Sequence, residues 1–138
     1  MADVKWTPQQ LQAIEGRGGN ILVSAAAGSG KTAVLVERVI SRLTDPEHPV
    51  DADHLLVVTF SNAAAGEMKQ RISRKLWELL EENPGDPRLA RQQILLDSAQ
   101  ISTIHSFCIT LLRQHFHHLE IPAGFRVPDE RELDVLRM

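Results

Sequence analysis

The stretch from Ala25 to Thr32, AAAGSGKT, constrains the fold of this chain more than any other feature. It follows a short apolar run at residues 21–23, which we predict to be a buried strand. It precedes a segment whose apolar residues recur at helical spacing, namely Val36, Val39, Ile40 and Leu43. A strand, a glycine-containing loop and a helix in this order predict a βα unit of an α/β fold.

The loop fits the pattern of a phosphate cradle, G-x-x-x-x-G-K-[ST], with Ala25 in the slot of the first glycine. Such a loop must point backbone N–H groups at phosphate oxygens, where the helix dipole favours negative charge. We expect Gly28 and Gly30 to supply unusual backbone angles, and Ala25 to be tolerated where no positive φ is needed. The alternative is a glycine-containing turn with an incidental lysine.

Within the cradle, we expect Lys31 to reach the β- and γ-phosphates and the Thr32 hydroxyl to ligate Mg²⁺. These two residues are the catalytic candidates. The predicted nucleotide-binding residues of the loop are Ala25, Ala26, Ala27, Gly28, Ser29, Gly30, Lys31 and Thr32.

The remaining elements alternate between helices and strands. Thr7-Pro8-Gln9-Gln10 marks a helix start, with Leu11 and Ile14 as the predicted buried face and the glycines at 16–19 as its end. Residues 54–60, HLLVVTF, predict a second strand that is covered on both faces. Residues 99–104, AQISTI, predict a third strand. Together they favour a doubly wound α/β fold.

Three further helices are predicted. One begins at Asn62, and a second covers residues 88–97. A third spans residues 105–119. The apolar stripe of the first is Met68, Ile72, Leu76 and Leu79, and that of the third is Phe107, Leu111, Leu112, Phe116 and Leu119. The last stretch of the chain carries turn signals followed by a short helical pattern.

Composition limits the possible function classes. A chain of 138 residues with 43% hydrophobic residues is one domain with a real core. Its net charge of −3 excludes a global polycation that would bind nucleic acid along its whole surface. Cys108 is the single cysteine, so an internal disulfide or a cysteine-built metal site is excluded. We find no signal-peptide pattern and no apolar run of membrane-spanning length, and expect a cytoplasmic protein without a membrane partner.

Four stretches, WTPQQLQAI, SAAAGSGKTAVLVERV, VVTFSNAAAGEMKQRI and ISTIHSFCITLLR, resemble in order and spacing the first motifs of superfamily 1 DNA helicases of the UvrD/RecB type. Within that family they are most similar to the helicase–nuclease proteins of the AddA type. The cradle of this superfamily commonly reads A-x-x-G-x-G-K-T, so Ala25 matches it.

This resemblance implies a P-loop NTPase of the RecA-like type, a parallel sheet flanked by helices. Residues 1–138 would be the N-terminal portion of its ATP-binding domain, a partial domain 1A. It also implies ATP and Mg²⁺ as cofactors, and its implied partners are single-stranded DNA and an AddB-type protein. The implied role is in double-strand-break repair and recombination.

The resemblance assigns further site residues. Gln10 matches the glutamine that hydrogen-bonds adenine, although it is also the fourth residue of a Thr-x-x-Gln capping box. Thr59, Phe60 and Asn62 match motif Ia on single-stranded DNA; alternatively Phe60 is core and Asn62 caps the helix. The last matching pair is Thr103 and His105 of motif Ib, where His105 could equally be a neighbour of a helix cap.

Two clusters have a simpler explanation. Lys69, Arg71, Arg74 and Lys75 would make a DNA track, but a solvated helix face is commoner. The histidines at 115, 117 and 118 are a weak metal signal, because only the first and third share a helical face and no carboxylate or thiol is well placed beside them. Histidines also suit a helix C-terminus.

Hydrolysis of ATP requires an acidic pair on Mg²⁺ and cationic fingers. Asp129-Glu130 follows Pro128 and no buried strand, so we reject it as the Walker B pair. We expect the Walker B strand, the second RecA-like domain and the nuclease domain to be absent, so that the chain binds ATP but hydrolyses it poorly. The alternatives are a small P-loop kinase and a non-catalytic nucleotide-binding module.

Overall fold

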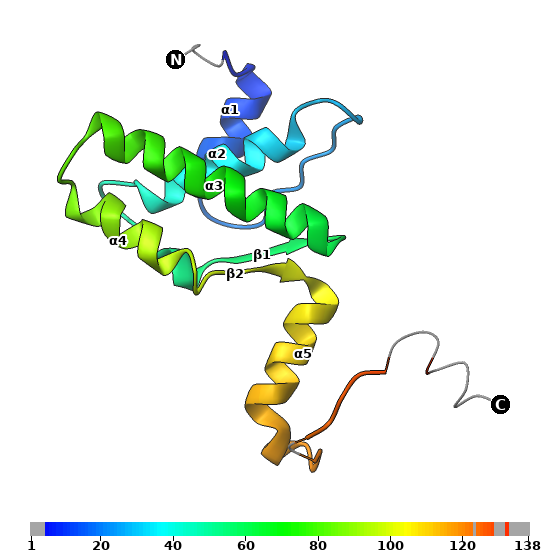
Figure 1. Cartoon of the computed structure of the whole chain (residues 1–138). Coiled ribbons are helices and arrows are strands. Elements are labelled where there is room, and N and C mark those ends of the chain that lie inside the picture. The colour runs from blue at the N-terminus through cyan, green and yellow to red at the C-terminus, as the bar shows by residue number, and fades with distance from the viewer. Residues whose placement is uncertain (1–4, 123, 129–131, 133–138) are drawn as a thin grey trace. The chain divides into compact units, whose positions relative to one another are not determined.

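A computed structural model describes residues 5–122, 124–128 and 132 of the chain. Its elements (Figure 1) are, in order, α1 (Pro8–Glu15), α2 (Lys31–Leu43), the 3₁₀ turn η1 (Ala52–His54), β1 (Leu56–Thr59), α3 (Asn62–Glu82), α4 (Pro87–Leu95), β2 (Gln100–Thr103), α5 (Ile104–His115) and the 3₁₀ turn η2 (Phe116–His118). They fall into two compact units, which divide between Thr103 and Ile104.

The start of α1 is the predicted one. The Thr7 side chain accepts from the Gln10 N–H, the Gln10 side chain accepts from the Thr7 N–H, and proline occupies the first turn. Of the predicted buried face, Ile14 is buried, but Leu11 is 39% exposed and Ala13 is buried in its place. The reason is that α1 packs on Val34 of α2 through its last turn, which turns Leu11 away from the contact.

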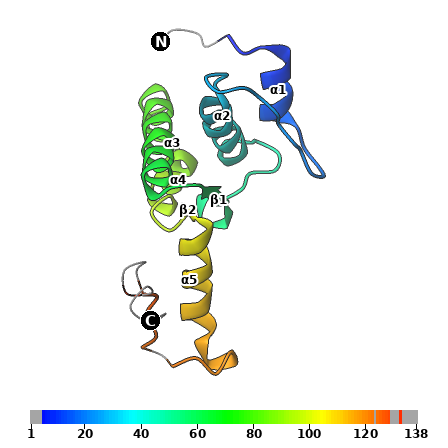
Figure 2. The same ribbon diagram turned by 90° about the vertical axis from the view of Figure 1, so that its right-hand side faces the viewer.

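The core of the first unit lies between α2, α3 and α4. Figure 2 shows α2 between α1 on one side and α3 on the other, and both pairs are in contact. All four predicted core residues of α2 are buried, and so are Met68, Ile72 and Leu76 of α3. Leu79 packs at the edge of this cluster. The helical periodicity therefore predicted both buried faces correctly.

The sheet consists of β1 and β2, which pair in parallel with Leu56 opposite Gln100 and Thr59 opposite Thr103. Val57 and Ile101 join the core formed with the helices. The prediction that both faces of β1 are covered is wrong, because Leu56 is 50% exposed on the opposite face. Parallel strands flanked by helices nevertheless confirm the predicted α/β class.

The predicted strand at residues 21–23 is not formed. This segment is not hydrogen-bonded into the sheet, and Leu22 is 96% exposed. A strand exists only where a neighbour pairs with its N–H and C=O groups, and the sheet of the described residues contains β1 and β2 alone. The apolar run is present, but its pairing partner is not.

The other helices follow the predictions closely. Ser61 rather than Asn62 is the N-cap of α3, because its side chain accepts from the Ala64 N–H. In the second unit, α5 stops at His115, and none of the described residues from 104 onward is buried. Most of the predicted C-terminal helical pattern lies outside the described residues. No described helix is both long and apolar enough to span a membrane.

Two isoleucines test the position of the core. Ile72 is fully buried on α3, whereas Ile94 of α4 is 73% exposed. We expect Ile72→Ala to lower the free energy of unfolding by about 2–4 kcal/mol, because it removes buried methylenes and leaves a cavity. The matched change Ile94→Ala should cost no more than about 0.5 kcal/mol. Urea denaturation measures both, and equal losses would contradict the packing described here.

Candidate functional site

The glycine-containing loop leads directly into α2, and its backbone adopts the angles that the sequence pattern requires. Gly28 has a φ of 77° and Gly30, the N-cap residue of α2, has a φ of 83°. Both lie in the left-handed region that glycine enters without strain. Among the described residues, Glu120 is the one non-glycine with a positive φ. Ala25 therefore sits where a Cβ is tolerated, as the sequence pattern required.

Lys31 is the first residue of α2, and its side chain folds back over the loop. Its Nζ donates to the carbonyl oxygens of Ala25 at 2.7 Å and Ala26 at 2.6 Å. The loop residues and Thr32 are all solvent-exposed. Since Gly30 offers no side-chain cap to the described first turn of α2, the N-terminal N–H groups of this helix present the positive end of its dipole to solvent.

Gln10 connects α1 to this loop. Its Oε1 accepts from the Thr7 N–H at 2.8 Å, and its Nε2 donates to the Ser29 carbonyl oxygen at 3.3 Å. The two interpretations of Gln10 therefore coexist: it completes the capping box and it also reaches the phosphate cradle. The structure thus brings the side chains of Gln10 and Lys31 to one loop, although 21 positions separate them in the sequence.

A cavity of about 750 Å³ lies between α1, the loop and α2. Two cationic side chains, those of Lys31 and Arg38, line it. None of the described residues that line it carries a carboxylate: Thr7, Gln9, Gln10, Ala13, Gly19, Asn20, Ile21, Val23, Ser24, Ala25, Ser29, Lys31, Val34, Leu35 and Arg38. A cavity with this lining suits an anionic ligand that also has an apolar part.

The C-terminal end of α1 is held by arginines from α2, which the sequence motifs did not single out. Arg38 Nη1 donates to the carbonyl oxygens of Ala13 at 2.6 Å, Ile14 at 3.3 Å and Gly16 at 3.1 Å. Arg42 Nη2 donates to the same Gly16 oxygen at 2.6 Å. The available signal was their i, i+4 spacing, which places both guanidinium groups on one side of α2.

A third arginine, Arg17, approaches the same end of α1 from the following turn. Its Nη1 donates to the Glu15 carbonyl oxygen at 2.6 Å, and its Nη2 donates to the Asp45 carboxylate at 3.2 Å. The pKa of Asp45 is lowered to about 2 by the backbone N–H groups of His48 and Glu47 and by Arg17. Burial and the charges of Arg17 and Arg38 lower the pKa of Arg42.

The residues assigned to DNA lie at the carboxyl ends of the two strands. Thr59 and Thr103 are register partners at the end of the ladder, and Thr103 is 8% exposed. Phe60 is completely exposed, so the interpretation that it belongs to the core is wrong. Asn62 is the first residue of α3 rather than its cap. His105 is exposed on α5 and belongs to the second unit.

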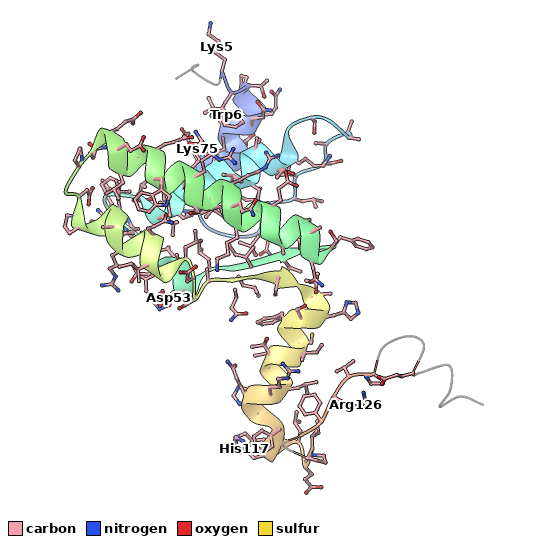
Figure 3. All side chains as sticks on the ribbon, in the orientation of Figure 1. Lys5, Trp6, Asp53, Lys75, His117 and Arg126 are labelled. Carbon is pink, nitrogen blue, oxygen red and sulfur yellow. The ribbon has the colours of Figure 1, made fainter. Side chains whose placement is uncertain are left out.

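The basic stretch of α3 is largely ion-paired. Lys69 meets Asp97 at 3.3 Å, Arg71 meets Glu67 at 2.6 Å, and Lys75, labelled in Figure 3, lies 3.9 Å from Glu37 and from Glu78. These internal pairs favour the solvated-face interpretation over a DNA track, because a DNA phosphate would have to displace an intramolecular carboxylate.

The histidines at the end of α5 stack on one another. The ring centroids of His117 and His118 lie 4.0 Å apart, and those of His115 and His118 lie 6.2 Å apart. Within the described part of the chain, no group of three or more His, Cys, Asp or Glu side chains could hold a metal ion. Asp129 and Glu130 lie outside the described residues.

Comparison with known proteins adds independent information. The family model described as "UvrD/REP helicase N-terminal domain" matches residues 6–137. The chain is 57% identical over 138 residues to AddA, the larger-named component of the ATP-dependent helicase/nuclease, from Desulforamulus reducens. It is 54% and 50% identical to the proteins of the same name from Clostridium novyi and Clostridioides difficile, each over 137 residues. These alignments cover 99–100% of this chain and 11% of each relative.

The Asp45 carboxylate provides a test of the electrostatics at α1. Its pKa is lowered in the folded protein to about 2 from an ordinary value of 3.8. Its contribution to stability is therefore complete above pH 4 and is lost as the pH falls towards 2. We expect NMR titration of the Asp45 carboxyl carbon to give a midpoint near 2.

The variant Arg17→Ala separates the causes of this shift. It should raise the midpoint of Asp45 but leave it below 3.8, because the N–H groups of His48 and Glu47, the largest causes, still donate to the carboxylate. A wild-type midpoint at the ordinary value would contradict the contacts described here.

Proposed function

Because the chain belongs to the UvrD/REP helicase N-terminal domain family, we propose that it binds ATP with Mg²⁺ at the loop Ala25–Thr32 and α1. The observation that carries this proposal is the loop geometry: two left-handed glycines place Lys31 and the N-terminus of α2 at one end of a cavity without carboxylates. This combination suits a polyphosphate better than any other common ligand.

Each residue of the loop has a proposed role. The N–H groups that follow Gly30 donate to phosphate oxygens, and Lys31 exchanges its carbonyl partners for the β- and γ-phosphates. Thr32, exposed in the first turn of α2, supplies a hydroxyl ligand. Mg²⁺ would neutralise phosphate charge there. The nearby Ala25, Ala26, Ala27, Gly28 and Ser29 contribute backbone rather than side-chain contacts.

Gln10 is proposed to recognise the adenine base. Its Oε1 has two lone pairs and uses one on the Thr7 N–H, so the second can accept from the exocyclic amino group of adenine. Nε2 can release the Ser29 carbonyl and donate to a ring nitrogen. Guanine presents an oxygen where adenine presents its amino group, and that oxygen would face Oε1 without a proton between them. The capping bond thus fixes the amide orientation that favours adenine.

We place single-stranded DNA at the carboxyl ends of β1 and β2. Phe60 offers a fully exposed ring on which a base can stack. Thr59 and Asn62 lie beside it in sequence and offer polar groups to the backbone, and Thr103 ends the neighbouring strand. His105 is the remaining proposed contact.

For the whole protein, the names of the relatives support an ATP-dependent helicase and nuclease. We propose that the parent activity is ATP-driven translocation and unwinding in double-strand-break repair, together with an AddB-type partner protein. The 138 residues correspond to the front of its ATP-binding domain. Neither described strand carries a carboxylate at its carboxyl end, so this chain by itself should bind ATP but hydrolyse it poorly.

Lys31→Ala tests the nucleotide site. We expect it to weaken Mg²⁺–ATP binding by about 10- to 100-fold, because a charge-assisted contact to phosphate contributes about 1.5–3 kcal/mol. Isothermal titration calorimetry measures the affinity. The control is Lys69→Ala, which removes a lysine that pairs with Asp97 on α3 and should leave binding unchanged. ATP binding that ignores Lys31→Ala would refute the proposed site.

Phe60→Ala tests the DNA contact. We expect it to weaken binding of a fluorescent oligothymidine by about 5- to 100-fold, since stacking of one base contributes about 1–3 kcal/mol. Fluorescence anisotropy gives the affinity. Trp77→Ala is the matched control, because Trp77 is another exposed aromatic residue, 52% exposed on α3. Equal losses for the two variants would argue for unspecific adhesion instead of a base platform at Phe60.

A further inference from the structure

We propose that Arg38 and Arg42 are positioning residues that hold α1 so that Gln10 can read the base, an inference that rests on the proposed function of Gln10. Both guanidinium groups act on the far end of the helix that carries Gln10. They touch the carbonyl oxygens of Ala13, Ile14 and Gly16 and no part of the phosphate loop that any hydrogen bond of the described residues records.

The first step concerns the weakness of α1 as an isolated element. It has eight residues, which is below the length at which a helix is stable alone in water. Its apolar contact is small, with Ala13 and Ile14 packing on Val34 beside the partly buried Trp6. Its last turn contains no basic residue that could stabilise the helix C-terminus. Its position therefore depends on groups supplied by other elements.

The second step concerns the strength of the arginine contacts. A helix end leaves its last carbonyls without intrahelical donors, and here guanidinium groups supply them at 2.6–3.3 Å. Charge-assisted bonds of this kind are about twice as strong as neutral ones. The fork of Arg38 spans three carbonyls, so it restrains the direction of α1 as well as its distance from α2.

The third step connects the clamp to the site. Lys31 and Arg38 belong to the same helix, about two turns apart. The helix that carries the phosphate loop at its N-terminus thus also holds α1 through Arg38 and Arg42. Gln10 meets Ser29 from the N-terminal half of α1. A small tilt of α1 would therefore move the amide of Gln10 away from the base while leaving the cradle in place.

Gly16 shows how closely this junction is packed. A Cβ at this position would lie 2.6 Å from Cδ1 of Ile21 and 2.8 Å from the Gln12 carbonyl oxygen. Both are too close for a real side chain, and the second is backbone. The junction therefore has no room for an additional methyl group, which agrees with a fixed connection between α1 and α2.

The experiment measures base selectivity separately from phosphate affinity. Dissociation constants of the 138-residue chain for Mg²⁺–ATP, Mg²⁺–GTP and Mg²⁺–tripolyphosphate are obtained for the wild type and for Gln10→Ala, Arg38→Ala, Arg38→Lys and Arg42→Ala. We expect Arg42→Ala and Arg38→Ala to reduce the ATP-over-GTP preference by about tenfold, towards that of Gln10→Ala. Tripolyphosphate affinity should stay within about twofold for Arg42→Ala, which does not line the cavity.

Two further comparisons exclude a merely structural role. Arg38→Lys keeps the charge but not the three-carbonyl fork, so it should recover only part of the preference. The double variant Gln10→Ala/Arg42→Ala should be no less selective than Gln10→Ala, because both changes remove one coupled function. Arg91→Ala is the charge-matched control, since Arg91 pairs with Asp51 on α4, and it should leave selectivity unchanged.

Amide hydrogen exchange provides a readout without nucleotide. Arg38→Ala and Arg42→Ala should raise exchange in α1 and leave α3 protected. If Arg38→Ala raises exchange in α3 as well, the unit has unfolded, and Arg42→Ala and Arg38→Lys decide by the same measurements. Wild-type selectivity in Arg42→Ala and Arg38→Lys, with selectivity lost in Gln10→Ala, overturns the clamp alone. A wild type that binds neither ATP nor tripolyphosphate overturns the proposed function and the clamp together.

Discussion

The packing of α2 against α3 is the interaction on which the rest of the first unit depends. Leu43, Ile72 and Leu76 are the largest fully buried side chains, and each contributes about 1.5–3 kcal/mol by leaving water. The phosphate loop has no such contacts, because all of its residues are exposed. Its position is therefore set by α2, whose apolar stripe is anchored far from the loop itself.

The opposite side of α2 is held by different forces. There the apolar contact with α1 is small, and the arginine–carbonyl bonds give it direction. Hydrogen bonds depend on distance and angle far more steeply than apolar contacts do. The unit thus combines a broad apolar interface on the side of the cradle's helix with a narrow, directional one on the side of Gln10. A change at the second interface can alter base recognition without disturbing the first.

The sequence predicted those elements that depend on local periodicity and capping. The buried faces of α2 and α3 follow from 3.6-residue spacing, and the start of α1 follows from the Thr7-Pro8 pair with Gln10. The prediction failed where a non-local partner decides. The run at residues 21–23 has strand composition, but composition does not supply a neighbouring strand. Leu56 is apolar yet half exposed, because an apolar side chain needs a covering layer before it can be buried.

The same distinction holds for the candidate site. The left-handed angles of Gly28 and Gly30 and the tolerance for Ala25 could be deduced from the loop pattern alone. The arginine contacts could not, because their acceptors are backbone carbonyls, which every sequence has and no motif marks. Gln10 lies between these cases. Its capping box and its reach to Ser29 are consistent with each other, since they use different atoms of one amide. The local motif orients the side chain, and that orientation makes a specific tertiary contact possible.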